Sequence, residues 1–123
     1  MPIDRTKTLG RRGEDLAAEH FERLGYRVLA RNHRTRFGEL DLVLADGAGD
    51  TIVFCEVKAR RVGGDWRENL HAAKRRQVRT MAAAWLSEVS ERPRHAELRF
   101  DAVGVTLDAR GELVRLDHLQ GAF

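Results

Sequence analysis

Residues 37–61 read FGELDLVLADGAGDTIVFCEVKARR, and this stretch decides the fold. Two apolar runs flank a glycine-rich turn at residues 46–50, which is typical of two paired β-strands. Both runs also carry charges, Asp41 in the first run and Glu56 and Lys58 in the second. Charges inside a sheet are costly unless they are compensated, and a bound cation is the usual compensation for clustered carboxylates. The stretch therefore predicts two neighbouring strands that carry a functional site.

The sequence around this stretch predicts an α/β fold with a mixed sheet flanked by helices. Leu16, Ala17, Phe21 and Leu24 recur at helical spacing, and Gly25 is a natural helix stop. The expected order is α-β-β-β-α-β-β, in which the first three strands are antiparallel and a strand after the second helix can return parallel. The elements are expected at residues 9–24, 26–32, 38–45, 51–58, 70–89, 97–107 and 112–119.

The composition indicates one globular domain over residues 1–123. Hydrophobic residues make up 42% of the chain and charged residues 33%. The lone Cys55 excludes an intramolecular disulfide and a cysteine-based zinc cluster. We expect neither a membrane span nor a secretory signal, because the chain has no long apolar run and no basic-then-apolar leader. These features favour the cytoplasm.

Strand alternation separates the charged residues from the apolar ones in the run at 51–58. Phe54, Glu56 and Lys58 share one face, and Cys55 faces the other way. We therefore expect Cys55 to be a core residue rather than a nucleophile. In the first strand, the same rule places Tyr26, Val28 and Ala30 on one side.

A pair of carboxylates is expected where the strands at 38–45 and 51–58 meet. Alternation gives one face to Glu39, Asp41 and Val43, and pairing through the turn brings Asp41 near Glu56. Two close carboxylates repel each other and raise one pKa unless a divalent cation lies between them. Oxygen ligands suit Mg²⁺ or Mn²⁺, and the adjacent Lys58 can orient water or stabilise charge on phosphorus. The chemistry indicated is metal-assisted phosphodiester hydrolysis.

Glu14 adds a third acid, because its spacing to Ala17 and Phe21 turns it toward the core-facing stripe of the first helix. The alternative for Asp41, Glu56 and Lys58 is a salt-bridged edge on a half-exposed sheet.

Asp101 interrupts the strand at 97–107 and can pair with a nearby arginine. His20 lies on the apolar stripe of the first helix, where a satisfied packing histidine is the default.

Basic residues are concentrated between Lys58 and Arg79, where eight Lys or Arg face two acids for a net charge of +6. Arginine dominates this set, and its planar guanidinium suits bidentate contact with phosphate. A solvated helix face is the alternative interpretation. The segment indicates a surface that can bind nucleic acid.

Asp41, then fourteen residues, then Glu56-Val57-Lys58 is similar to the core motif of the PD-(D/E)xK nuclease superfamily, with Leu40 in place of the usual proline. More closely, the chain resembles the YraN-type family of small bacterial proteins, described as endonuclease-like and related to archaeal Holliday junction resolvases. The resemblance covers nearly the whole chain. The residues that carry it are Gly10, Gly13-Glu14, Ala17, Asn32, Arg34, residues 38–43, residues 54–60, Lys74, Gln77 and Arg99-Phe100-Asp101.

The resemblance implies a restriction-endonuclease-like sheet and a metal-dependent DNA endonuclease. Asp41 and Glu56 would be ligands of Mg²⁺ or Mn²⁺, together with the backbone carbonyl of Val57, and Lys58 would be the catalytic lysine. Glu14 would complete the metal site directly or through water. The amide of Gln77 can reach the site from the second helix or simply lie at the helix edge. The basic residues expected to contact phosphates are Arg60, Arg61, Lys74, Arg75 and Arg76.

Two functions follow from these residues. The first is a nuclease acting on DNA, including branched or processed DNA. The second is a nucleic-acid-binding or scaffolding module that keeps the nuclease fold without turnover, because a fold does not guarantee a reaction. By analogy, cleavage of both strands of a symmetric substrate favours a homodimer, although nothing in the chain itself identifies an interface.

Overall fold

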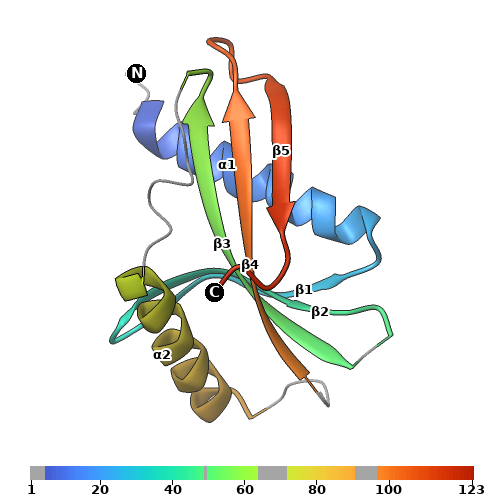
Figure 1. The fold of residues 1–123 in the computed structure, drawn as a ribbon, viewed down its shortest axis with the longest axis vertical. Helices are drawn as coiled ribbons and strands as arrows, with labels where there is room; N and C mark the ends of the chain where they lie inside the picture. Colours follow the sequence, from blue (N-terminus) through green and yellow to red (C-terminus); the bar gives the residue numbers. More distant parts are fainter. Residues whose placement is uncertain (1–4, 49, 64–71, 91–96) are drawn as a thin grey trace.

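The computed structural model describes residues 5–48, 50–63, 72–90 and 97–123, without the side chains of residues 5–8 and 72–75. Within these ranges, two helices and five strands follow each other in the predicted order α-β-β-β-α-β-β (Figure 1). Of the predicted second helix, residues 70–71 lie outside the described ranges. The elements are α1 (Arg5–Arg23), β1 (Arg27–Thr35), β2 (Gly38–Ala45), β3 (Thr51–Arg61), α2 (Ala72–Glu88), β4 (Glu97–Leu107) and β5 (Leu113–Leu119).

The strands form one mixed sheet in the order β1-β2-β3-β4-β5. Neighbours are antiparallel except for β3 and β4, which are parallel from Thr51↔Glu97 to Arg61↔Leu107. The chain passes through α2 between these two strands, and a crossover of this kind is what a parallel pair requires. The predicted antiparallel start and parallel return of the sheet are both confirmed.

The two helices pack on opposite faces of the sheet and bury separate apolar clusters. Alternation along β3 divides the clusters, because Val53 and Cys55 face α1 whereas Ile52 and Phe54 face α2. Cys55 is buried in the α1 cluster, which confirms its predicted core position. None of the helices in the described ranges is both long and apolar enough to cross a lipid bilayer.

Two predictions about apolar residues were wrong. Leu24 lies just beyond the end of α1 and is 54% exposed, because Gly25 already turns the chain away with φ 91°. Ala30 does not share a side with Tyr26 and Val28. A register shift between Val28 and Ala30 breaks the alternation, so Ala30 packs toward α2 while Tyr26 and Val28 pack toward α1.

A second irregularity lies at Asn32, which has a left-handed backbone with φ 50°. The register on either side, Arg31↔Leu42 and His33↔Leu40, places Asn32 opposite Asp41. Side-chain alternation changes there, because Leu40 packs toward α2 whereas Leu42 packs toward α1. The prediction that Glu39, Asp41 and Val43 share one face therefore fails at Asp41. Asparagine is one of the few residues that adopt this conformation at low cost.

Candidate functional site

The sheet divides at Asp41. Pairing between β2 and β3 stops at Leu42↔Cys55. Beyond this pair, the start of β2 is paired only with β1, and the end of β3 is paired only with β4. Figure 1 shows the β1–β2 hairpin diverging from the upper parts of β3, β4 and β5. At the point of divergence, the Asp41 carboxylate accepts a hydrogen bond of 2.8 Å from the Val57 N–H. A side-chain oxygen thus takes the place of the backbone carbonyl that a continuous ladder would supply.

Glu56 and Lys58 belong to β3 and lie beside Asp41 of β2. Glu56 is only 5% exposed, and its Oε1 is 3.2 Å from the Lys58 Nζ. The pKa of Asp41 is raised to about 8, by burial first and then by the Glu56 and Glu14 charges, while the Val57 N–H and Lys58 act in the opposite direction. Asp41 therefore holds a proton near neutral pH as long as nothing neutralises its neighbours. The predicted approach of the two carboxylates is confirmed.

Glu14 joins this group from α1, as its helical spacing predicted. It is half-buried, and its charge contributes to the raised pKa of Asp41. The preceding residue explains how the helix comes this close. A Cβ added to Gly13 would lie 2.7 Å from the Ala59 Cβ and 3.8 Å from Val57 Cγ1, so only glycine permits this contact.

The chemistry of these groups fits a divalent cation. The candidate donors are carboxylate and carbonyl oxygens, which Mg²⁺ and Mn²⁺ prefer, and a cation would relieve the repulsion that raises the pKa of Asp41. In the described part of the chain, no three His, Cys, Asp or Glu side chains come together as a metal cluster. The fit is therefore to a site with two carboxylates, completed by a backbone carbonyl and water, as is common for Mg²⁺.

The side chain of Gln77 reaches from α2 to the turn between β1 and β2. Its Nε2 donates a hydrogen bond of 3.0 Å to the Phe37 carbonyl, and it packs against Gly38, three residues before Asp41 along β2. The amide thus helps to hold the hairpin against α2.

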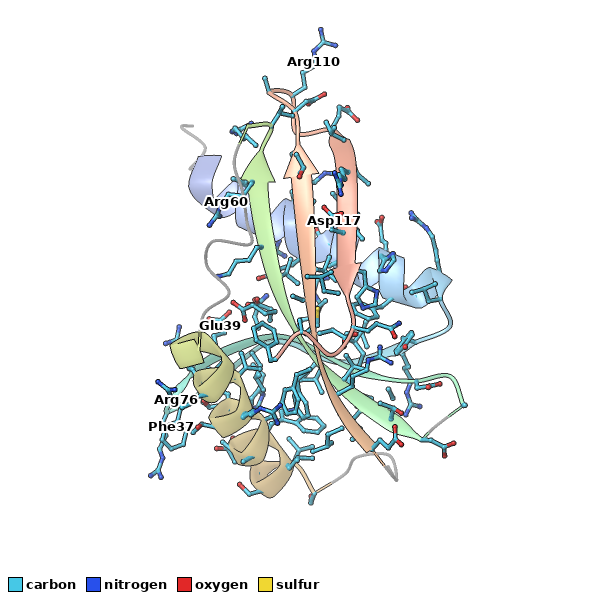
Figure 2. The ribbon with its side chains drawn as sticks, in the orientation of Figure 1. Phe37, Glu39, Arg60, Arg76, Arg110 and Asp117 are labelled. Atoms are coloured by element: carbon cyan, nitrogen blue, oxygen red, sulfur yellow. The ribbon has the colours of Figure 1, made fainter. Side chains whose placement is uncertain are left out.

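The predicted phosphate-binding residues are spread along β3 and α2. One guanidinium nitrogen of Arg60 donates a hydrogen bond of 2.9 Å to the Ala59 carbonyl, and one of Arg61 donates a hydrogen bond of 3.2 Å to the Asp108 carbonyl. Figure 2 shows Arg60 on upper β3 and the exposed Arg76 on α2, both at the same side of the view. The side chains of Lys74 and Arg75 lie outside the described residues.

Asp101 organises a second buried polar cluster. It is fully buried and accepts two hydrogen bonds of 2.8 Å from Arg99, which confirms the predicted arginine partner. The sequence did not indicate His118, whose Nε2 lies 2.7 Å from Asp101 Oδ2 and whose Nδ1 lies 3.0 Å from the Nε2 of His20. His20 is thus a satisfied packing histidine, as predicted. The sequence indicated this role of His20 only through its place on the apolar stripe of α1, because His20, Asp101 and His118 are far apart in the chain.

With this geometry established, comparison with known proteins identifies the family. Residues 13–105 match the family model described as "Uncharacterised protein family UPF0102". The chain belongs to the UPF0102 family. The matched range includes Glu14, Asp41, Glu56, Lys58 and Asp101.

Individual UPF0102 proteins match along nearly their whole length. The chain is 45% identical over 125 residues to a UPF0102 protein of Frankia alni, covering 100% of both chains. It is 41% identical over 123 residues to one of Pelotomaculum thermopropionicum, covering 98% of each. With a UPF0102 protein of Geobacter sulfurreducens the identity is 43% over 119 residues, covering 95% of this chain and 89% of the relative. The resemblance seen in the sequence is thus confirmed as membership of the UPF0102 family.

Proposed function

We propose that this UPF0102 protein is a metal-dependent endonuclease that hydrolyses phosphodiester bonds in DNA. The observation that carries the proposal is the convergence of Asp41 and Glu56 where β2 and β3 part, with Lys58 on the same strand as Glu56. The raised pKa of Asp41 supports it further, because a site built only for stability would not bring buried carboxylates close enough to repel. The relation to PD-(D/E)xK nucleases and Holliday junction resolvases is part of this proposal.

Each residue has a role in the proposed reaction. Asp41, Glu56 and the Val57 carbonyl would hold Mg²⁺ or Mn²⁺, with Glu14 acting through water. A bound cation would supply Lewis-acid polarisation of the phosphate and would lower the pKa of a ligating water. Asp41 would lose its proton to the solvent on binding the cation. Lys58 turns from Glu56 toward the phosphate, where its ammonium group stabilises the developing negative charge.

The basic residues supply the DNA-binding surface in this proposal. Arg60, on the same strand as Glu56 and Lys58, and Arg76 on α2 would contact phosphates, together with Arg61, Lys74 and Arg75. Branched or processed DNA is the proposed substrate, and a homodimer would place two such sites on its two strands. The cytoplasm is the proposed compartment, since a free buried Cys55 suits reducing conditions.

Cleavage assays with matched variants test the proposal. Purified protein is incubated with Mg²⁺, Mn²⁺ or EDTA and with duplex, single-stranded, flapped and four-way junction DNA. Glu56→Gln should abolish metal-dependent cleavage, and Lys58→Met should lower it roughly 100-fold or more. Glu19→Gln, which alters an acid paired with Arg23 on the exposed surface of α1, should cleave like wild type. Equal cleavage by wild type and Glu56→Gln on every substrate would exclude the proposed nuclease activity.

A silent nucleic-acid-binding module is the second candidate, and one observation favours it. The Lys58 ammonium already pairs with Glu56 at 3.2 Å and Asp41 holds a proton, so charge in the site is partly balanced without a cation. Calorimetry separates the two functions. A nuclease site should bind Mn²⁺ and lose it in Asp41→Ala, whereas a binding module should show salt-dependent DNA affinity that needs no metal.

A further inference from the structure

The turn between β1 and β2 is held rigidly against α2. Thr35 Oγ1 donates to the Gly38 carbonyl at 2.9 Å and accepts from the Phe37 N–H at 3.1 Å, and Gln77 binds the Phe37 carbonyl. Gly38 has φ 134°, and a Cβ there would lie 2.8 Å from the Gln77 amide nitrogen and 3.0 Å from Met81 Sδ. The backbone of this turn is therefore fixed from both sides.

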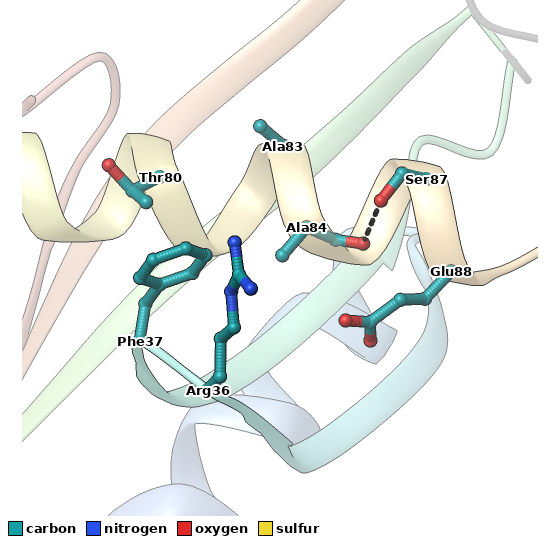
Figure 3. Close-up of a pocket in the computed structure, with 7 residues that line it drawn as sticks. All are labelled: Arg36, Phe37, Thr80, Ala83, Ala84, Ser87 and Glu88. Carbon is teal, nitrogen blue, oxygen red and sulfur yellow. Dashed lines mark hydrogen bonds between the residues drawn. The ribbon is translucent and has the colours of Figure 1, made fainter.

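This fixed turn nevertheless presents an aromatic ring to solvent. Phe37 is 41% exposed, and the Arg36 guanidinium lies 4.7 Å from the centre of its ring. Both side chains face α2 across a hollow of about 500 Å³, a size found for small-ligand sites (Figure 3). The helix side of the hollow is lined by short side chains and one acid, namely Thr80, Ala83, Ala84, Ser87 and Glu88.

The charge around the hollow suits a nucleic-acid strand. Arg36 lines the hollow and is exposed, and the exposed Arg34 and Arg76 lie on neighbouring parts of β1 and α2. Of the acids nearby, Glu39 lies 3.8 Å from Arg34 and Glu88 lies 3.5 Å from His33. The hollow is also close to the candidate site. Phe37, in the turn just before β2, precedes Asp41 by four positions, which corresponds to about 13 Å of extended chain. A strand bound at the carboxylates would reach the hollow within a few nucleotides.

We propose that Arg36 and Phe37, with the facing surface of α2, form a site for one unpaired nucleobase of the bound DNA. The base stacks on the Phe37 ring in place of the Arg36 guanidinium and faces Ala83 and Ala84 of α2, and the displaced Arg36 contacts its phosphate or its second face. This inference rests on the proposed DNA-binding function and specifies its substrate as DNA with unpaired nucleotides beside the cleavage site.

Stacking explains the exposed ring better than packing does. A ring kept for the core would be buried, whereas a rigidly mounted, exposed ring loses little freedom when a base stacks on it. Every base has a flat face, so binding should tolerate changes in sequence. Glu88 lies at the far end of the hollow in Figure 3, where its carboxylate is 3.5 Å from the Nε2 of His33.

The test measures binding without metal, so that cleavage plays no part. Fluorescence anisotropy in EDTA compares a blunt duplex with the same duplex carrying a short unpaired flap, and 2-aminopurine in the flap reports stacking by quenching. Phe37→Ala should bind the flapped DNA about 5- to 100-fold more weakly than wild type and lose the quenching, with unchanged affinity for the blunt duplex. Phe37→Trp should keep both. Leu113→Ala, which removes a comparably exposed apolar side chain on β5, should behave as wild type.

Each result has a distinct meaning. If Phe37→Ala and wild type bind flapped DNA equally and quench 2-aminopurine equally, the base site is wrong while the proposed nuclease stands. If wild type binds no DNA of any kind, both proposals fail. If Phe37→Ala binds every DNA more weakly by the same factor, Phe37 supports the fold or general affinity, and the base site is again wrong. Thermal unfolding of each variant confirms that it is folded.

Discussion

Gly13 of α1 lies directly against Ala59 of β3, so closely that a Cβ on Gly13 would stand 2.7 Å from the Ala59 Cβ. A glycine inside a helix costs about 1 kcal/mol relative to alanine. Its presence here is explained by the close approach, which carries the neighbouring Glu14 toward Asp41. The contact thus links the packing of the helix to the charge of the site.

Gly13→Ala should therefore destabilise the protein despite alanine's higher helix propensity. The added methyl group forces α1 away from β3, and we expect a net loss of roughly 1–3 kcal/mol together with weaker Mn²⁺ binding. Gly10→Ala is the matched control, because none of the residues that the structure describes lies within 4 Å of a Cβ at this position of the same helix. Gly10→Ala should raise stability by up to about 1 kcal/mol. Urea unfolding measures both, and similar effects at the two positions would contradict the close contact.

Asp41 should make the metal-free protein less stable as the pH rises. Its pKa is 3.8 in the unfolded chain and about 8 in the fold, so between these values the folded state holds a proton that the unfolded state has lost. Folding is therefore disfavoured progressively up to about pH 8. Asp41→Asn keeps an acceptor for the Val57 N–H and removes the charge, so it should be more stable than wild type in EDTA at pH 8, by on the order of 1–3 kcal/mol.

Urea unfolding between pH 5 and pH 9 in EDTA measures this effect. The difference between wild type and Asp41→Asn should widen with pH, and Mn²⁺ should stabilise wild type more than the variant. Parallel pH curves for the two proteins would show that Asp41 is not the group responsible.

The His20 and Asp101 cluster should make the protein sensitive to acid. The pKa of His20 is lowered from 6.5 by burial, by His118 and by Arg23, so the fold opposes its protonation. Burial alone would raise the pKa of Asp101, but hydrogen bonds from His118 and Arg99 outweigh it and lower the pKa. Both groups therefore cost stability as the pH falls, His20 below about 6.5 and Asp101 below its unfolded value of 3.8.

His20→Gln should flatten the part of this loss that begins below about pH 6.5, since an amide can bond to His118 without gaining charge. Asp101→Asn should lower stability at pH 7 by roughly 2–4 kcal/mol, because Arg99 loses a buried charged partner. Thermal unfolding across this pH range checks both variants. An acid loss that is unchanged in His20→Gln would assign it to other groups.

Asn32 should tolerate glycine better than any branched residue. Its φ of 50° is accessible to glycine without strain, whereas Asn32→Val should cost roughly 1–2 kcal/mol. Because Asn32 lies opposite Asp41, the valine variant should also bind Mn²⁺ more weakly, and Asn32→Gly should bind it as wild type does. Calorimetry and thermal unfolding measure the two effects. Equal stability of the glycine and valine variants would show that the left-handed backbone is not required.

Periodicity was enough to predict the elements and the orientation of three residues of the candidate site. Glu56 and Lys58 share a face because β3 is regular, and Glu14 turns inward because α1 is regular. The departures occur where regularity ends. The alternation of β2 breaks at Asp41, opposite the left-handed Asn32 of β1, and no hydrophobic pattern encodes a single backbone conformation. The contacts of Asp101 with His118 and of His118 with His20 depend on strand order, which only the assembled sheet defines.

The division of the sheet at Asp41 has a consequence for how the site can move. The arm of the sheet that holds the end of β1 and the start of β2 packs on α2 through Gly38 and Leu40, whereas the arm formed by the ends of β3 and β4 together with β5 packs on α1. Asp41 and Glu56 lie where these two arms meet, and each carboxylate is carried by a different arm. A change in the angle between the arms would therefore change the distance between the two carboxylates.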